Sequence, residues 1–169
     1  MVLDGHWENA EYVNDDNIRI FLTTQPISIS EGIDFVKTEG AGAVISFGGT
    51  TRDSFEGKGV EDLSYEAYHE LALRTLTKIT REAIAKFKDA NKDECIHRVY
   101  LCHRLGVVPV KEESIVLCLS STHRQEGWNC GIWMLDTIKE RAEIWKKENY
   151  TDGSASWKEN DNSNVQSRT

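Results

Sequence analysis

Several features are scarce in this 169-residue chain, and each absence excludes a class of protein. Only two prolines occur, Pro26 and Pro109, and neither marks a linker; repeats and low-complexity blocks are absent. No apolar run approaches the ~20 residues of a membrane-spanning helix. Basic residues are also fewer than acidic ones: the chain has 20 Lys and Arg and 28 Asp and Glu, which gives a net charge of −8. This balance argues against general nucleic-acid binding.

What remains fits one globular domain. The length suits a single core, and hydrophobic residues make up 39% of the chain. The four cysteines form no C-x-x-C pair and lie in apolar stretches, so we expect buried free thiols in a reducing compartment (Cys95, Cys102, Cys118 and Cys130). The N-terminus lacks the basic and apolar regions of a signal peptide, which favours the cytosol. We find no pattern of a metal site, a serine triad or a dinucleotide fingerprint.

The chain divides into three regions by composition. Residues 1–17 are polar and acidic, and we expect them to form a flexible N-terminal segment. Residues 18–152 carry the apolar periodicity of a folded domain. Residues 153–169 are rich in Ser, Asn, Asp and Lys and predict a polar C-terminal tail, in which Trp157 is the only large apolar group.

Hydrophobic periodicity predicts an α+β fold with a mixed sheet and two main helices. Strands are expected at 18–22, 41–47, 62–68, 96–101, 114–120 and, as an extended segment, 144–150. The apolar run 41–47 indicates a strand buried on both faces. A short helix is expected to start with the capping-box spacing of 28–31 and to end at Gly40, and a longer one covers 72–87. A third begins after Thr122 and ends near Ala142, with Trp128, Ile132, Leu135 and Ile138 on its inner side.

The loop 48–53 (GGTTRD) is the first candidate for chemistry. Its glycines allow backbone amides to approach a ligand, Thr50 and Thr51 supply hydroxyls, and the planar fork of Arg52 suits an oxyanion. It lacks the G-K-[ST] ending of a phosphate-binding P-loop. Taken alone, these residues favour an ordinary glycine turn with a solvated arginine.

Residues 120–124 (SSTHR) are the second candidate. A strand end followed by a helix start places unpaired amides and the positive end of the helix dipole where an anion binds. His123 and Arg124 would add a titratable donor and a fixed charge. An ordinary Ser/Thr cap followed by two exposed polar residues explains the pattern equally well.

Two lysines near the end of the last helix are the third candidate. Lys139 and Lys146 are seven residues apart, and Trp145 beside Lys146 supplies apolar surface. Desolvation and neighbouring cations make a lysine amine a better nucleophile or proton carrier. Most lysines on surface helices do nothing catalytic, and by themselves these two favour that interpretation.

A cationic pocket in an acidic protein would suit a small anionic substrate such as a phosphate. The segment 103–106 (HRLG) repeats the His-Arg pair but falls between strands. We interpret it as a structural turn, in which Gly106 provides backbone freedom and Arg104 pairs with an acidic neighbour.

Five short strings of the sequence share their order and spacing with a known family. They are 42–47 running into 49–52, then 63–68, 103–106, 121–124 and 144–148. Together they resemble the large, catalytic subunits of molybdopterin synthase, over roughly 18–157. The resemblance implies an α/β-hammerhead fold, a central homodimer and a heterotetramer with two small ubiquitin-like sulfur-carrier subunits. It further implies transfer of two sulfurs, from the thiocarboxylate on the carrier's Gly-Gly tail to cyclic pyranopterin monophosphate, without a metal or other cofactor.

The resemblance also implies roles for matching residues. The substrate-binding loop would be Thr50, Thr51 and Arg52, and the pterin-phosphate pocket would contain His123 and Arg124. Lys139 would lie at the terminal carbonyl of the carrier tail and lead catalysis, with Lys146 as the second essential lysine. The same binding segment contains Lys147 and Glu148.

Two positions depart from the family pattern. Glu143 stands where many relatives have a helix-stopping proline, so the end of the helix is less defined, and we expect the carboxylate to face solvent. Gly48-Gly49 replaces a larger residue and a glycine.

Two other hypotheses for the function remain: a non-catalytic module that binds a ubiquitin-like tail, and a nucleotide- or RNA-binding domain. The net charge and the lack of stacking aromatics beside the basic residues weigh against the second.

Overall fold

The computed structural model describes residues 11–158 and contains three helices and two sheets in that range. The helices are α1 (Ile29–Val36), α2 (His69–Lys86) and α3 (Arg124–Arg141). The strands are β1 (Glu11–Asn14), β2 (Ile18–Thr23), β3 (Ala43–Thr50), β4 (Ser54–Phe55), β5 (Lys58–Ala67), β6 (Ile96–Arg104), β7 (Gly106–Pro109), β8 (Glu113–Ser121), β9 (Ile144–Tyr150) and β10 (Ala155–Lys158).

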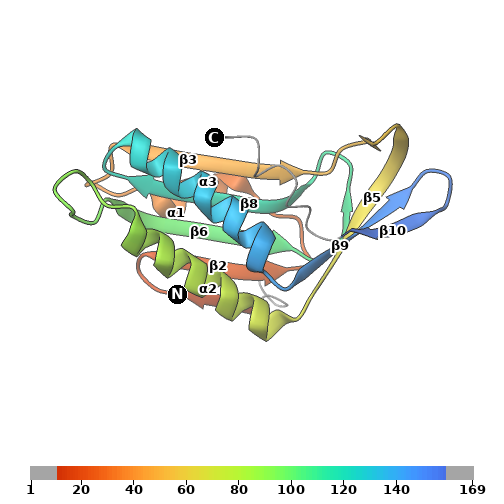
Figure 1. Cartoon of the computed structure of the whole chain (residues 1–169), viewed down its shortest axis with the longest axis horizontal. Coiled ribbons are helices and arrows are strands. Elements are labelled where there is room, and N and C mark those ends of the chain that lie inside the picture. Colours follow the sequence, from red (N-terminus) through yellow and green to blue (C-terminus); the bar gives the residue numbers. More distant parts are fainter. Residues whose placement is uncertain (1–10, 159–169) are drawn as a thin grey trace.

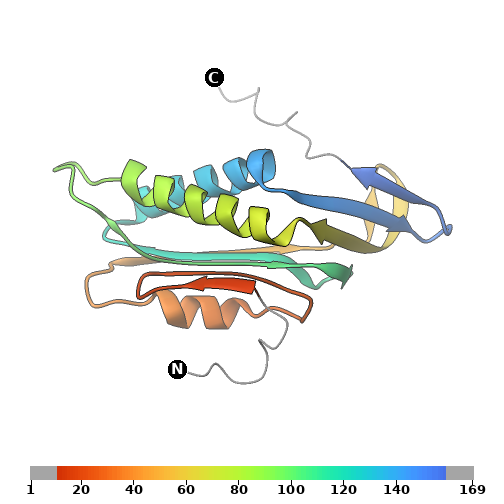
Figure 2. The ribbon, with the colours of Figure 1, turned by 90° about the horizontal axis from the view of Figure 1, so that it is seen from below.

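The large sheet has the strand order β1-β2-β6-β8-β3. Its neighbours are antiparallel except for β2 and β6, which run parallel, so the predicted mixed sheet is confirmed. Figure 1 shows α2 and α3 lying across one face of this sheet, and Figure 2 shows α1 covering the other. We call this three-layered unit, the large sheet with its three helices, the body.

Alternation along the strands divides the apolar residues between two cores. Leu101 and Leu119 face α2 and α3, whereas Tyr100, Cys102 and Cys118 face α1. All four cysteines are buried and free, as predicted. Helix α1 ends at Val36, before the expected Gly40, because Lys37 already has extended backbone angles.

The second sheet forms an arm that projects from one end of the body (Figures 1 and 2). The arm has the order β10-β9-β5-β4, and β7 also pairs with β5. The polar tail predicted from residue 153 therefore contains a strand, because Gly153, with a φ of +83°, turns the chain back so that β10 pairs with β9. The predicted flexible segment 1–17 likewise contains β1, which pairs with β2; residues 1–10 and 159–169 lie outside the described residues.

Strand β3 is not buried on both faces, so this interpretation of its apolar run was wrong. It pairs with β8 on one side and forms an edge of the sheet in the described part of the chain. Val44 and Phe47 are 39% and 42% exposed. An apolar run alone does not distinguish a central strand from an edge strand whose surface is covered by another molecule.

The inner face of α3 also differs from the prediction. Gly127, Cys130, Gly131 and Met134 are buried against the sheet, whereas Trp128 and Ile132, which we placed inside, are about half exposed. Two glycines one turn apart allow the helix axis to approach β3 closely, and this close approach rotates the large side chains outward. Ile138 is buried as predicted.

The close approach predicts opposite effects for two alanine substitutions. A Cβ atom at Gly127 would lie 2.5 Å from Ser121 Oγ and 2.9 Å from Ile45 Cγ1, whereas one at Gly131 meets no atom closer than 3.7 Å. We expect Gly127→Ala to lower the free energy of unfolding by about 1–3 kcal/mol through overpacking. Gly131→Ala should raise it by up to about 1 kcal/mol through helix propensity. Urea denaturation measures both; equal values for the two variants would contradict the close approach.

Candidate active site

A cavity of about 470 Å³ lies where the body meets the arm. The body contributes residues of the large sheet and of the last turns of α3, and the arm contributes the facing side of β5 and β9. Its polar and charged lining residues are Thr50, Arg52, Ser54, Tyr65, His103, Ser114, Asp136, Lys139, Lys146 and Glu148. Its apolar lining includes Phe47, Phe55, Leu63, Ile115, Ile132 and Leu135.

Three predicted cations meet in this cavity from three separate segments. Arg52 comes from the crossing between β3 and β4, Lys139 from the last turn of α3, and Lys146 from β9. In the described part of the chain, neither Arg52 nor Lys139 forms an ion pair within 4 Å. Both charges are therefore available to an anionic ligand.

A buried carboxylate holds the third cation. Glu148 is 2% exposed, and its Oε1 lies 3.5 Å from Lys146 Nζ. The Tyr150 hydroxyl donates a hydrogen bond of 2.7 Å to Glu148 Oε2, which is the main reason why the pKa of Tyr150 rises to about 12. A carboxylate buried this deeply needs a counter-charge, and the Lys146 ammonium provides it. Tyr150 is a member of this group that the sequence did not indicate.

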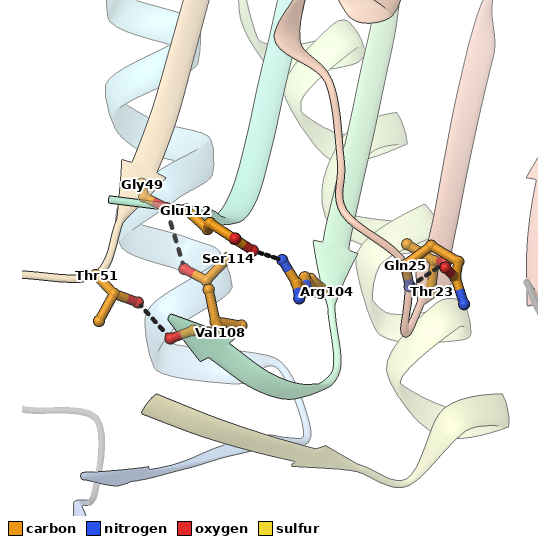
Figure 3. A network of polar contacts seen from close by, with 8 residues as sticks. All are labelled: Thr23, Gln25, Gly49, Thr51, Arg104, Val108, Glu112 and Ser114. Atoms are coloured by element: carbon orange, nitrogen blue, oxygen red, sulfur yellow. Dashed lines mark hydrogen bonds and ion pairs between the residues drawn. The ribbon is translucent and has the colours of Figure 1, made fainter. Parts of the chain in front are cut away.

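The loop that carries Arg52 is anchored on both sides (Figure 3). Thr51 is 2% exposed, its hydroxyl donates to the Val108 carbonyl at 3.1 Å, and it lies outside the cavity lining. The Ser114 hydroxyl donates to the Gly49 carbonyl at 3.2 Å. These contacts hold the two residues that flank Thr50, which itself lines the cavity. Thr51 is placed to fix the loop, and its predicted contact with substrate stays a prediction.

The HRLG segment is a structural turn, as predicted. Arg104 is buried and pairs with Glu112, close to the loop (Figure 3). Gly106 has a φ of +76°, which suits glycine. The same turn brings His103 into the cavity wall, and this role was not foreseen.

His103 and Tyr65 form the floor of the cavity. Their rings meet edge to face with centroids 4.9 Å apart. His103 Nδ1 donates to the Arg104 carbonyl at 2.8 Å, and burial lowers the pKa of His103 from 6.5 to about 4. Burial likewise raises the pKa of Tyr65, against the opposing effect of a hydrogen bond with Ser114. Both groups are therefore neutral at pH 7.

The buried neutral His103 predicts a pH dependence of stability. Between pH 6.5 and 4 the unfolded chain binds a proton that the folded protein excludes, so stability is complete above pH 6.5 and falls as the pH drops towards 4. The full effect corresponds to about 3 kcal/mol. His103→Asn, whose amide can donate to the same carbonyl, should flatten this part of the curve. Urea titrations at pH 4.5 and 7.5 measure the difference, and an unchanged slope would contradict it.

Four predicted site residues lie outside this cavity: Thr51, His123, Arg124 and Lys147. His123 caps the N-terminus of α3, and both His123 and Arg124 are exposed. Lys139 stands 15 residues further along the same helix, about 22 Å away at 1.5 Å per residue. One small ligand cannot touch both ends within one chain. Lys147 points to the opposite face of β9, where its Nζ lies 5.9 Å from the ring centroid of Trp157.

Glu143 does not simply face solvent, so this expectation was wrong. Its Oε1 accepts a hydrogen bond of 3.0 Å from the Thr75 hydroxyl of α2, and its Oε2 is buried. Helix α3 nevertheless ends at Arg141 without a proline, because Ala142 has extended angles, with φ −76° and ψ 137°. Among the described residues, Glu143 forms no ion pair with Lys139 or Lys146 within 4 Å.

The described residues contain no cluster of three or more His, Cys, Asp or Glu side chains that could hold a metal ion. None of the helices in residues 11–158 has the length and apolar character needed to cross a membrane.

The fold and the cavity define an α+β protein in which cations converge between a helix-covered sheet and an arm. The chain belongs to the MoaE protein family, whose family model matches residues 22–141. A relative from Aspergillus oryzae, named molybdopterin synthase catalytic subunit, is 43% identical over 144 residues, which cover 85% of this chain and 76% of the relative.

Solved structures agree with this assignment. Molybdopterin synthase from Staphylococcus aureus is 28% identical, with a TM-score of 0.73 over 81% of this chain and 94% of that one, which confirms the expected hammerhead fold. A chain from the complex of subunits 1 and 2 of the molybdopterin-converting factor from Helicobacter pylori shares the fold at 18% identity, with a TM-score of 0.56 over 70% of this chain and 73% of that one.

Proposed function

We propose that this chain is the catalytic subunit of molybdopterin synthase, a sulfurtransferase that acts in the cytosol. It takes sulfur from the C-terminal thiocarboxylate of a small ubiquitin-like carrier and transfers it to cyclic pyranopterin monophosphate. The observation that carries the proposal is the convergence of Arg52, Lys139 and Lys146 in one cavity. The family of the chain and the names of its relatives support it.

The cavity suits the chemistry of this transfer. The thiocarboxylate sulfur forms a bond to a side-chain carbon of the pterin, the bond from that carbon to an oxygen breaks, and the oxygen leaves with a proton. Water then cleaves the bond between the sulfur and the acyl carbon. The carrier leaves as a carboxylate, the sulfur stays on the pterin, and a second carrier delivers the second sulfur. Fixed cations stabilise the oxyanions of both steps, and Lys139 can carry the proton that a departing oxygen needs.

The apolar part of the lining suits an extended carrier tail. Phe47, Phe55, Ile132 and Leu135 give the cavity apolar walls next to the cations. A Gly-Gly tail has no side chains to accommodate and presents its backbone and terminal charge. We place the end of this tail at Lys139, with the substrate phosphate at Arg52 and Thr50.

A homodimer would bring His123 and Arg124 to the same site. Strand β3 is an edge, and beside it Trp128 and Ile132 expose apolar surface. The beginning of β3 lies next to His123, since Gly42 N donates to Ser121 O at 3.0 Å, and its end leads into the cavity at Thr50. Antiparallel pairing of two β3 strands around a two-fold axis reverses one copy relative to the other. Each cavity would then receive the His-Arg pair of the second copy.

Mixing two inactive variants tests this shared site. Arg124→Ala and Lys139→Ala homodimers should each form little product. In a mixed dimer, one cavity contains both wild-type residues, so co-refolded mixtures should regain a substantial part of the activity. Mixtures that stay inactive while the heterodimer demonstrably forms would show that the residues do not act across an interface.

Reconstitution tests the function itself. The purified chain, thiocarboxylated carrier and cyclic pyranopterin monophosphate should together yield molybdopterin, detected by mass spectrometry, whereas carrier with a plain carboxylate should yield none. Carrier binding without product from the pterin would overturn the enzymatic assignment and favour a module that only binds the tail.

A further inference from the structure

The body and the arm are joined through several short connections, and two of these lie together next to the cavity. Tyr68 alone separates β5 from α2, and only Ala142 and Glu143 separate α3 from β9. Lys139 lies on the body side of the second connection, four residues before Glu143, and Lys146 lies on the arm side, three residues after it. Any rotation at this connection therefore changes the separation of the two lysines directly.

Glu143 ties both connections together. Its backbone carbonyl accepts a hydrogen bond of 3.2 Å from Tyr68 N, which links the two crossings. Its side-chain Oε1 accepts a hydrogen bond of 3.0 Å from the hydroxyl of Thr75, on the second turn of α2. Residue 143 thus contacts both the residue that links β5 to α2 and a helix of the body, and neither Tyr68 nor Thr75 lines the cavity.

We propose that Glu143 is a positioning residue, whose side-chain bond to Thr75 sets the angle between body and arm and so the separation of Lys139 from Lys146. The inference rests on the proposed function, because it assumes that both lysines act on one substrate. The chain has no proline at this connection, so backbone rotation at Ala142 and Glu143 is restricted by contacts rather than by a ring.

The cost of losing the contact follows from the geometry of the cavity. The body carries Lys139, the arm carries Lys146 and both line the same cavity, so a change of angle between body and arm moves the two amines relative to each other. A misplacement of about 1 Å at a reacting centre can lower a rate by up to 100-fold. The contact should therefore affect turnover more than substrate affinity, which depends on many other lining residues.

Two disruptive variants, a matched control for each and one double variant test the inference in the reconstituted reaction. Glu143→Ala removes the acceptor and Thr75→Val removes the donor, and each should lower kcat about tenfold with little change in KM for the carrier. Glu143→Gln keeps an acceptor oxygen and Thr75→Ser keeps the hydroxyl, so both should stay within about twofold of the wild type. The double variant Glu143→Ala/Thr75→Val should be no slower than either single one, because one contact is lost in all three.

A distance measurement separates positioning from general destabilisation. Spin labels at Lys78→Cys in α2 and Glu61→Cys in β5 report the angle between body and arm. The distance distribution should broaden in Glu143→Ala and stay narrow in Glu143→Gln. Unchanged kcat in Glu143→Ala, or effects of the two single variants that multiply in the double variant, would overturn the inference. If the wild type formed no product, the proposed function would be overturned instead. The distance measurement would still show whether the hydrogen bond between Glu143 and Thr75 fixes the angle between body and arm.

Discussion

Replacing Lys139 with alanine is expected to lower product formation about 1,000-fold while leaving the thermal midpoint unchanged. Lys139 stands exposed in the last turn of α3, lines the cavity, and has no ion pair among residues 11–158 that its loss would break. Its amine is therefore free to serve the reaction. Single-turnover assays with thiocarboxylated carrier measure the loss, and Lys78→Ala, on the exposed side of α2, is the control for removal of a lysine.

Lys139→Arg distinguishes a fixed charge from a proton carrier. A guanidinium keeps the positive charge but does not release its proton near neutral pH. We expect this variant to remain about 100-fold below the wild type. An arginine variant with full activity would show that Lys139 contributes charge alone, and an active alanine variant would remove it from the mechanism.

Replacing Lys146 with alanine is expected to reduce both activity and stability. The Glu148 carboxylate, buried and bonded to Tyr150, would lose its counter-charge. Leaving it unpaired should cost about 2 kcal/mol of the free energy of unfolding, because Lys146 itself is partly exposed and screened. Product formation should fall about 100-fold through loss of the cation in the cavity. Urea denaturation and the reconstituted assay measure the two effects separately.

The double variant Lys146→Ala/Glu148→Gln separates these contributions. Removing the unpaired charge should restore most of the stability and none of the activity. Full stability in the single Lys146→Ala variant would mean that the pair contributes nothing to folding. Recovered activity in the double variant would mean that Lys146 acts only as the partner of Glu148.

Local patterns predicted most elements of this fold but not their environment. The alternation in β5 and the apolar spacing in α2 are properties of a single segment, so they could be read directly from the sequence. The exposure of β3 and the rotation of α3 depend on neighbours distant in sequence. Gly127 and Gly131 decide which side of α3 faces the sheet, and a search for apolar residues gives no weight to glycine.

For the candidate site too, the sequence indicated individual residues but not their surroundings. Considered alone, Arg52 and the two lysines favoured ordinary surface roles, and only the resemblance pointed to a site. The structure brings them together, and it adds Ser114 and Asp136, which no local pattern marked, and His103, whose segment we had interpreted only as a structural turn. Because Asp136 and Glu148 line the cavity beside the three cations, its net positive charge is smaller than the sequence predicted. His123 and Arg124 cannot reach the cavity of their own chain, because the length of α3 fixes their distance from Lys139.

The parallel pairing of β2 with β6 has a consequence for the order of folding. Ile18 lies beside Val99, so 80 residues must be synthesised between the two partners. Contacts this distant in sequence form slowly, since the closure of a long loop precedes any gain from the strand pair. The antiparallel pair of β6 with β8 joins strands that follow each other closely in the chain, with Cys102 beside Val116, and does not require such a long loop. The first strands to leave the ribosome therefore wait for a partner that is synthesised much later, and until then their apolar side chains stay open to chaperones and to other unfolded chains.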